Sequence, residues 1–222
     1  MNKKEFINLV DRELIQKSDI KSIHPYEPIQ VFECPKDWTC IGTGNYAAVF
    51  VYKHDNNFVV KVYAEGREGI EEETEVYKRL GEHPSYSTLI HRGANYLILK
   101  RIKGITLYNA LIKGERISKQ VIKDINIALM YAREKGLNPV DVHGKNVMMY
   151  KGRGYVVDVS DFLKEKRDTK WRDLERAYNK IYLKTLYKNP IPVPSFILNL
   201  VRRSYRNFKQ FTSLFNKWAV KN

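Results

Sequence analysis

Asp141, Asn146 and Asp158 are spaced so that they could bind a metal ion and activate a hydroxyl group. Asp141 and Asn146 lie in a polar stretch between a predicted helix and a predicted hairpin, and Asp158 follows the second strand of that hairpin. Asn146 precedes the first strand, so we expect it to meet Asp158 at the open end. Their oxygens suit Mg²⁺, and Asp141 could accept a proton from an attacking hydroxyl. Alternatively, Asp141 and Asn146 only shape the loop.

Lys61 is a charged residue in the middle of an apolar strand, residues 58–63. Burying an ammonium group is costly unless an opposite charge accompanies it. Glu73 is predicted to lie on the apolar face of the next helix, residues 69–80, and two inward charges of opposite sign are cheaper together than apart. Lys61 would then be held where it can reach a phosphate. A purely structural ion pair, or a lysine that reaches water at a sheet edge, is the alternative.

Gly42 and Gly44 form a glycine pair whose backbone could approach phosphates closely. A dinucleotide-binding loop would lead directly into a helix. Here the following residues, 49–52, continue as a strand, so the glycines are expected at the tip of a hairpin that could cover a nucleotide. An ordinary glycine-containing turn has the same pattern.

The elements that must position these residues divide the chain into two halves. The first half is strand-rich, and its predicted elements are an amphipathic helix over 1–20, strands within 28–63 with a turn at Asn56 and Asn57, a helix over 69–80, and two strands around 96–102.

The second half is mainly helical. Ser118 is a predicted N-cap for a helix that runs to residue 135, and Gly136 ends it. The hairpin over 147–159 follows, and then helices with a proline-containing break at 190–194. Strands followed by helices predict an α+β architecture of two lobes.

The composition suits one globular domain or two small lobes that share a cleft. The chain has 222 residues, of which 43% are hydrophobic and 29% are charged. Its two cysteines form neither a zinc pattern nor a disulfide framework. The N-terminus lacks the apolar run of a signal peptide, and no later stretch is long enough to be a transmembrane segment, so a cytoplasmic location is expected.

Positive charge is concentrated near the C-terminus. The net charge is +14, and from Asp161 onward fifteen basic residues stand against five acidic ones. A stripe of basic residues at every fourth position and a second basic cluster interleaved with aromatics predict a site for a polyanion, namely nucleic acid, an acidic protein or a membrane surface. A solvated face with buried aromatics is the alternative. The residues concerned are Arg176, Lys180, Lys184, Lys188, Arg202, Arg203, Tyr205, Arg206, Phe208, Lys209, Phe211 and Phe215.

Together, these motifs resemble the protein-kinase-like superfamily, and most closely its small bacterial serine/threonine-kinase-like members. The order of glycine-rich hairpin, strand lysine, helix glutamate, Asp-x-x-x-x-Asn loop and hairpin-end aspartate carries the resemblance, over residues 38–178. It implies a two-lobed kinase-like fold, with an N-terminal segment and β-rich N-lobe over 1–102 and a reduced helical C-lobe over 103–222.

The resemblance also implies a role for each site residue. Lys61 would engage the phosphates of ATP and pair with Glu73, Asp141 would be the catalytic base, and Asn146 and Asp158 would hold Mg²⁺ or Mn²⁺. The hairpin and a hinge near residues 99–102 would contact the nucleotide. The implied nucleotide-binding residues are Ile41, Gly42, Gly44, Val49, Lys61, Lys100 and Ile102.

Several residues depart from the usual kinase pattern. The usual lysine two positions after the catalytic aspartate is His143 here, which could contact the phosphoryl group or simply pack. The usual Asp-Phe-Gly is Asp-Val-Ser, residues 158–160, and Trp171 arrives only thirteen residues after Asp158, which leaves almost no activation segment. The resemblance implies that Asp173 braces the catalytic loop by accepting hydrogen bonds from the backbone N–H groups of that loop, and an exposed acid at the start of a helix is the alternative.

The predicted function is an ATP-dependent phosphotransferase, acting on serine or threonine hydroxyls of a protein substrate. A non-catalytic nucleotide-binding module, a pseudokinase, is one alternative, suggested by the altered Asp-Val-Ser. A small-molecule kinase is another, because the Asp-x-His-x-x-Asn loop resembles that of aminoglycoside phosphotransferases. A polyanion-binding protein with a decayed nucleotide site is the fourth reading.

Overall fold

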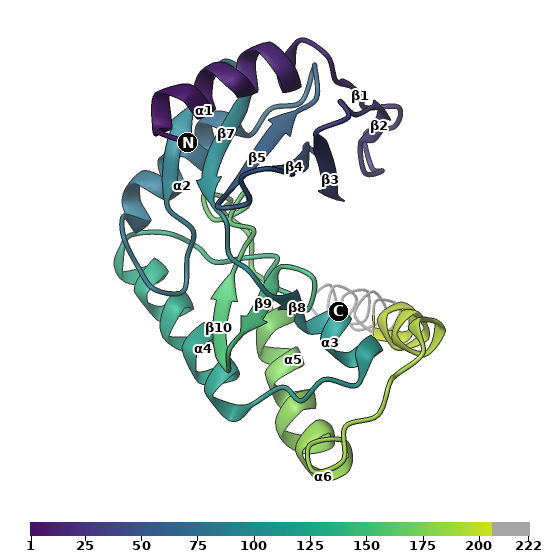
Figure 1. Ribbon diagram of the computed structural model, residues 1–222. Helices are drawn as coiled ribbons and strands as arrows, with labels where there is room; N and C mark the ends of the chain where they lie inside the picture. Colours follow the sequence, from purple (N-terminus) through teal and green to yellow (C-terminus); the bar gives the residue numbers. More distant parts are fainter. Residues whose placement is uncertain (206–222) are drawn as a thin grey trace, which may run out of the picture.

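The chain has an α+β architecture, as the sequence predicts. A computed structural model describes residues 1–205. In Figure 1 the β-rich part with the N-terminus lies at the top, and the mainly helical part lies below it. The predicted order, strands first and helices later, is confirmed over the described residues.

A five-stranded antiparallel sheet forms the centre of the β-rich part. Its strand order is β3-β4-β5-β7-β6. The strands are β3 (Trp38–Thr43), β4 (Ala47–Tyr52), β5 (Phe58–Tyr63), β6 (Leu89–Arg92) and β7 (Tyr96–Lys100). The turn predicted at Asn56 and Asn57 joins β4 to β5, so this prediction is confirmed.

The N-terminal segment differs in part from its prediction. Helix α1 (Lys3–Leu9) begins at an Asn2–Glu5 capping box and continues as the π-helical turn η1 (Val10–Ile15). The predicted helix over 1–20 is too long, because β1 (Asp19–Lys21) already begins there. Strand β2 (Gln30–Glu33) pairs with β1 in a separate two-stranded sheet and does not join the central one.

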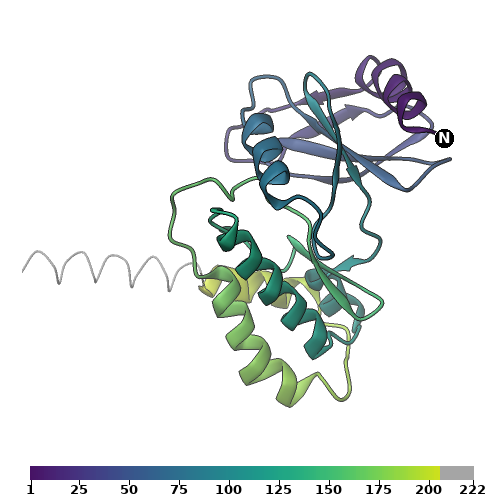
Figure 2. The same cartoon turned by 90° about the vertical axis from the view of Figure 1, so that its left-hand side faces the viewer.

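The two faces of the central sheet are covered by different helices. In β5, Val60 and Val62 face α1 and η1, and they share a hydrophobic core with Phe6. The alternate side chains, Lys61 and Tyr63, therefore point to the opposite face, which is covered by α2 (Ile70–Leu80). Figure 2 shows α1 at the top of the sheet and α2 on the side nearer to the helical part.

The connection between the two parts contains elements that the sequence patterns did not indicate. These are β8 (Ile105–Thr106) and α3 (Leu107–Lys113). Both are too short to show a clear hydrophobic period. A cap nevertheless marks the start of α3, because the side chain of Thr106 accepts a hydrogen bond from the Asn109 N–H at 3.1 Å.

The remaining elements follow the prediction. Ser118 caps the long helix α4 (Lys119–Glu134), and Gly136 follows its end with φ at +71°. The hairpin is formed by β9 (Val147–Tyr150) and β10 (Arg153–Val156). Helices α5 (Lys170–Ala177), η2 (Tyr178–Tyr182) and α6 (Leu183–Thr185) come next, and after the break at 190–194 a helix covers 195–205. Within residues 1–205, no helix is both long and apolar enough to cross a membrane.

Strand β10 packs closely against α4, and this contact holds the hairpin in place. A Cβ atom at Gly154 would lie 2.3 Å from the carbonyl oxygen of Val121, so only glycine fits there. Asp124 of α4 is 3% exposed and accepts hydrogen bonds from the Gly154 N–H at 3.0 Å and from Arg153 Nε at 2.7 Å. The buried carboxylate thus ties α4 to the hairpin that ends at the candidate site.

Replacing Asp124 should destabilise the protein. Asp124→Ala leaves the buried Gly154 N–H without its acceptor, at an expected cost of about 2 kcal/mol in the free energy of unfolding. Asp124→Asn keeps one acceptor oxygen and should cost about half of that. Urea denaturation followed by circular dichroism measures both. The exposed Asp37→Ala is the matched control, and an Asp124→Ala variant as stable as that control would contradict the role of this contact.

Candidate active site

Lys61 forms the predicted ion pair with Glu73. Lys61 Nζ lies 2.6 Å from Glu73 Oε2, which confirms the predicted pairing. The Glu73 side chain is completely buried, and that of Lys61 is 12% exposed. Burial raises the pKa of Glu73 more than the ammonium lowers it. For Lys61, burial opposes the charged form, but the carboxylates of Asp158 and Glu73 outweigh it and raise the pKa, so the amine stays protonated.

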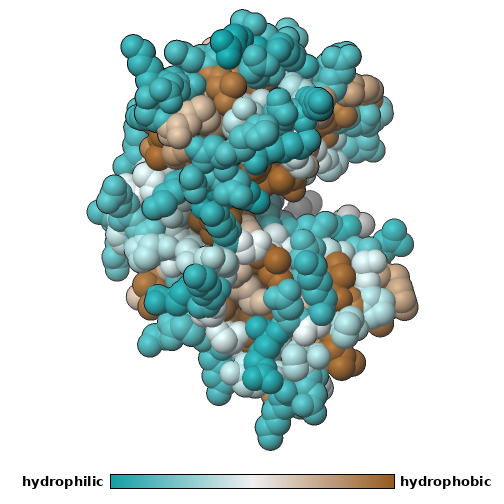
Figure 3. Space-filling model, in the orientation of Figure 1, coloured by the Kyte–Doolittle hydropathy of each residue, from teal (hydrophilic) through white to brown (hydrophobic). Residues whose placement is uncertain are grey.

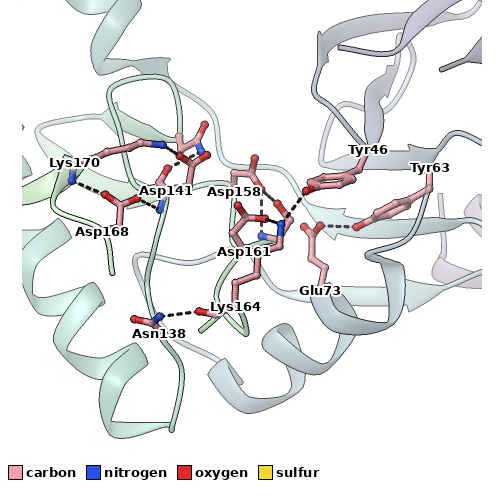
Figure 4. Close-up of polar contacts among 12 residues, drawn as sticks. Tyr46, Tyr63, Glu73, Asn138, Asp141, Asp158, Asp161, Lys164, Asp168 and Lys170 are labelled. Atoms are coloured by element: carbon pink, nitrogen blue, oxygen red, sulfur yellow. Dashed lines mark hydrogen bonds and ion pairs between the residues drawn. The ribbon is translucent and has the colours of Figure 1, made fainter. Parts of the chain in front are cut away.

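Tyr63 is a member of this cluster that the sequence reasoning missed. Its hydroxyl donates a short hydrogen bond to Glu73 Oε2, the same oxygen that Lys61 contacts. Figure 4 shows the two side chains pointing toward each other. The signal was available, because Tyr63 is two residues after Lys61 on one strand and so shares its face. Tyr63 and Lys61 together fix the carboxylate of Glu73.

Asp158 extends the cluster into the helical part. Its Oδ1 lies 3.5 Å from Lys61 Nζ and accepts hydrogen bonds from the hydroxyl of Ser160 at 2.7 Å and its N–H at 3.2 Å. Burial alone would raise the pKa of Asp158, but Lys61 and Ser160 outweigh it and hold the pKa below its usual value. The serine of the altered Asp-Val-Ser motif thus fixes the carboxylate as an anion. Because 40% of the side chain is exposed, a ligand can still reach it.

Asn146 and Asp158 meet at the open end of the β9–β10 hairpin, as the sequence predicts. Val147 pairs with Val156, and one step further the Val157 N–H donates to the Asn146 carbonyl at 3.0 Å. Asn146 Nδ2 donates to the carbonyl of Asp141 at 3.1 Å, which leaves the amide oxygen of Asn146 as an acceptor. The hairpin therefore brings the backbones of Asn146 and Asp158 to the same end, as predicted.

The donor set fits a magnesium ion that is bound together with a phosphate. Residues 1–205 contain no group of three or more His, Cys, Asp or Glu that could hold a metal by itself. Mg²⁺ commonly takes only one or two protein carboxylates and completes its shell with waters and substrate phosphates. One carboxylate from Asp158 and one amide oxygen from Asn146 match that requirement.

Asp141 is held in an unusual backbone conformation. Its φ is +59°, in the left-handed region that few residues other than glycine adopt. Its N–H donates to Asp168 Oδ2 at 2.7 Å, and the other oxygen of Asp168 accepts the Lys170 N–H at 2.6 Å. The acceptor of the Asp141 N–H is therefore Asp168, whereas the brace of this loop by Asp173 stays a prediction.

The carboxylate of Asp141 bonds to a lysine through one oxygen and has a histidine near the other oxygen. Its Oδ1 accepts a short hydrogen bond from Lys170 Nζ, whereas its Oδ2 lies 3.9 Å from His143 Nε2, beyond hydrogen-bonding distance. Burial lowers the pKa of His143, and the charges of Asp141, Lys170 and Asp158 all act on the same imidazole. Lys170, Asp141 and His143 thus form one polar cluster at the Asp141–Asn146 loop, and Figure 4 shows the contact between Lys170 and Asp141.

The glycine-rich hairpin joins β3 to β4 and contacts the segment after Asp158. Gly42 pairs with Val49, and an irregularity in the register falls at Ile41, which is exposed. At the tip, the hydroxyl of Tyr46 accepts a hydrogen bond from Lys164 Nζ at 2.8 Å (Figure 4). The Tyr46–Lys164 bond crosses between the two parts of the molecule, and no sequence pattern indicated it.

The two predicted hinge residues differ in what they can offer a ligand. The N–H of Lys100 donates to Thr88 at 2.9 Å, and its carbonyl accepts from the Ser87 hydroxyl at 2.7 Å. The backbone of Ile102 makes no such bond within residues 1–205. A nucleotide base would therefore find free backbone groups at Ile102.

The basic residues of the C-terminal region are exposed where the structure describes them. Arg176, Lys180, Lys184 and Lys188 all face solvent, although Arg176 has an acidic neighbour, Asp173, at 3.4 Å, which the sequence reasoning did not foresee. Polyanion binding by this region stays a prediction. Arg202, Arg203 and Tyr205 are described, whereas Arg206, Phe208, Lys209, Phe211 and Phe215 lie outside the described residues.

Comparison with known proteins identifies a relative of similar length. No protein-family model matches the chain. The putative serine/threonine-protein kinase YrzF of Bacillus subtilis (strain 168) is 33% identical over 180 residues, which cover 80% of this chain and 83% of that protein. The similarity extends over most of both chains, so it is more than a shared short motif. The chain therefore belongs to the same protein family as YrzF.

Proposed function

We propose that this protein is an ATP-dependent phosphotransferase with a two-lobed protein-kinase-like fold, and that its acceptor is a serine or threonine hydroxyl of a protein. The observation that carries the proposal is the Lys61–Glu73–Asp158 cluster, which joins a strand, a helix and a hairpin end that are far apart in the sequence. The relative named as a serine/threonine-protein kinase supports the same class of reaction and acceptor.

The nucleotide would be held from both parts of the molecule. Lys61 is a protonated amine fixed between two carboxylates, so it is preorganised to receive phosphate oxygens. The glycine-rich hairpin would cover the phosphates through Gly42 and Gly44, where an added Cβ would have open space or only ordinary contact. The free backbone groups of Ile102 would bind the edge of the base.

Asn146 and Asp158 would hold Mg²⁺ or Mn²⁺. When bound, the ion neutralises charge on the phosphate oxygens. The chain keeps Asp158 deprotonated and both ligands oriented: Ser160 and Lys61 hold Asp158 as an anion, and the Asp141 carbonyl orients the amide of Asn146.

Asp141 would act on the acceptor hydroxyl. Lys170 occupies its Oδ1, so Oδ2 is the oxygen that can accept the hydroxyl proton. As the proton moves to Asp141, the acceptor oxygen bonds to the γ-phosphorus, and the bond from that phosphorus to the bridging oxygen breaks. ADP leaves with the electron pair of the broken bond.

Phosphate transfer should depend on Asp141 and Asp158. With ATP labelled in the γ-phosphate and Mg²⁺ or Mn²⁺, the wild-type chain is expected to phosphorylate itself or a general protein substrate. Asp141→Asn should reduce the rate by about 10²-fold or more, because the hydroxyl loses its base. Asp158→Ala should reduce it at least as much, because the metal loses its carboxylate.

Three results would contradict this proposal in whole or in part. A wild-type chain that transfers no label, and whose nucleotide binding is unchanged in Asp158→Ala, is not a phosphotransferase of this kind. Tight nucleotide binding without turnover would favour a non-catalytic nucleotide-binding module. Transfer to a sugar or an aminoglycoside, but not to protein, would keep the chemistry and overturn the acceptor class.

Glu73 should be needed for efficient use of ATP. Glu73→Gln keeps the shape of the side chain but removes the charge that fixes Lys61, so kcat/KM for ATP should fall about tenfold. Glu72→Gln is the matched control, because Glu72 is exposed on the same helix. Equal rates for the two variants in steady-state assays would show that the ion pair is structural only.

A further inference from the structure

Lys170 lies next to the candidate base although it is distant from it in the sequence. It is the first residue of α5, and its ammonium donates to Oδ1 of Asp141, which is 29 residues earlier. His143, which lies in the Asp141–Asn146 loop, does not make this contact, because its Nε2 is 3.9 Å from Asp141 Oδ2 and burial lowers its pKa. The positive charge beside Asp141 therefore comes from another element.

Asp168 fixes the position of Lys170 relative to Asp141. One of its oxygens accepts the N–H of Asp141, and the other accepts the N–H of Lys170. One carboxylate thus holds both backbones, and Figure 4 shows Asp168 between the two residues. This arrangement is unlike a chance contact between two long surface side chains, because the backbone on each side of the ion pair is fixed.

The charge state and exposure of Lys170 suit contact with a ligand. Burial would lower the pKa of Lys170, but the hydrogen bond and charge of Asp141 outweigh it and raise the pKa, so the amine is protonated at neutral pH. Its side chain is 40% exposed, and that of Asp141 is 35% exposed. An ammonium has three hydrogens. One of these hydrogens is directed to Asp141, so the other two can be donated to an acceptor on the solvent-exposed side of the ammonium.

We propose that Lys170 is a catalytic residue that binds the phosphoryl group during its transfer to the acceptor at Asp141. This inference rests on the proposed phosphotransfer. Phosphoryl transfer is accelerated mainly by fixed positive charges around the equatorial oxygens of the transferring group. Lys61 contacts Asp158 and Lys170 contacts Asp141, so the two lysines would flank the donor side and the acceptor side of the same group. Lys170 donates hydrogen bonds and is not consumed.

The test compares binding of the ground state with binding of a mimic of the transferring group. The full-length chain is titrated with Mg-ADP alone and with Mg-ADP plus aluminium fluoride, which imitates the phosphoryl group in transfer. Lys170→Gln should weaken binding of the aluminium fluoride complex by about tenfold or more, change ADP binding by less than about twofold, and reduce kcat by about 10²-fold. Lys170→Arg keeps the charge and should recover part of each loss.

Arg172→Gln is the matched control, because it removes one exposed positive charge from the same helix. Arg172→Gln should leave the affinity for Mg-ADP, the affinity for the aluminium fluoride complex and kcat unchanged. If Lys170→Gln behaves like Arg172→Gln while the wild type is active, this inference is wrong and the proposed function stands. If both Lys170 variants lose affinity for ADP and for the mimic equally, Lys170 is only structural. A wild-type chain that binds neither complex would overturn the proposed function together with this inference.

Discussion

The buried ion pair between Lys61 and Glu73 constrains how the sheet and the helices of the β-rich part can pack. Neither charge would be stable alone in that position, since burial disfavours the ionised form of both. The pair exists only if β5 presents Lys61 on the face opposite to α1, and if α2 turns Glu73 toward the sheet. Tyr63 and Asp158 supply the remaining partners. Removing one partner leaves an uncompensated charge, so the cluster and the packing of α2 depend on each other.

A second constraint governs the helical part. Asp141 takes a left-handed backbone conformation, which is stabilised because Asp168 binds its N–H. Asp168 follows Asp158 by only ten residues, so the short segment between the hairpin and α5 must fold back onto the loop. Lys164 of this segment also reaches Tyr46 of the glycine-rich hairpin. This short segment thus contacts both the Asp141 loop and the β-rich part.

The sequence predicted those parts of the site that depend on local periodicity. Strand alternation and helix spacing placed Lys61 opposite Glu73, and hairpin geometry brought Asn146 to Asp158. The same alternation would have revealed Tyr63. In contrast, Asp168 and Lys170 contact Asp141 although they are 27 and 29 residues away in the sequence. Nothing in a polar loop indicates which of its side chains will contact a distant residue. Asp173 was assigned that role because similar aspartates brace the loop in the kinase-like family, and no spacing in the sequence pointed to Asp168.

We propose that the cluster at Lys61 and the hairpin end at Asp158 form one site for a nucleotide with its metal ion. Isothermal titration of the wild-type chain with ATP, with and without Mg²⁺, tests it most directly. Mg²⁺ should strengthen ATP binding by about tenfold or more, because Asp158 and Asn146 would bind the ion only when phosphates complete its shell. Equal ATP affinity with and without Mg²⁺, or no binding in either case, would contradict it.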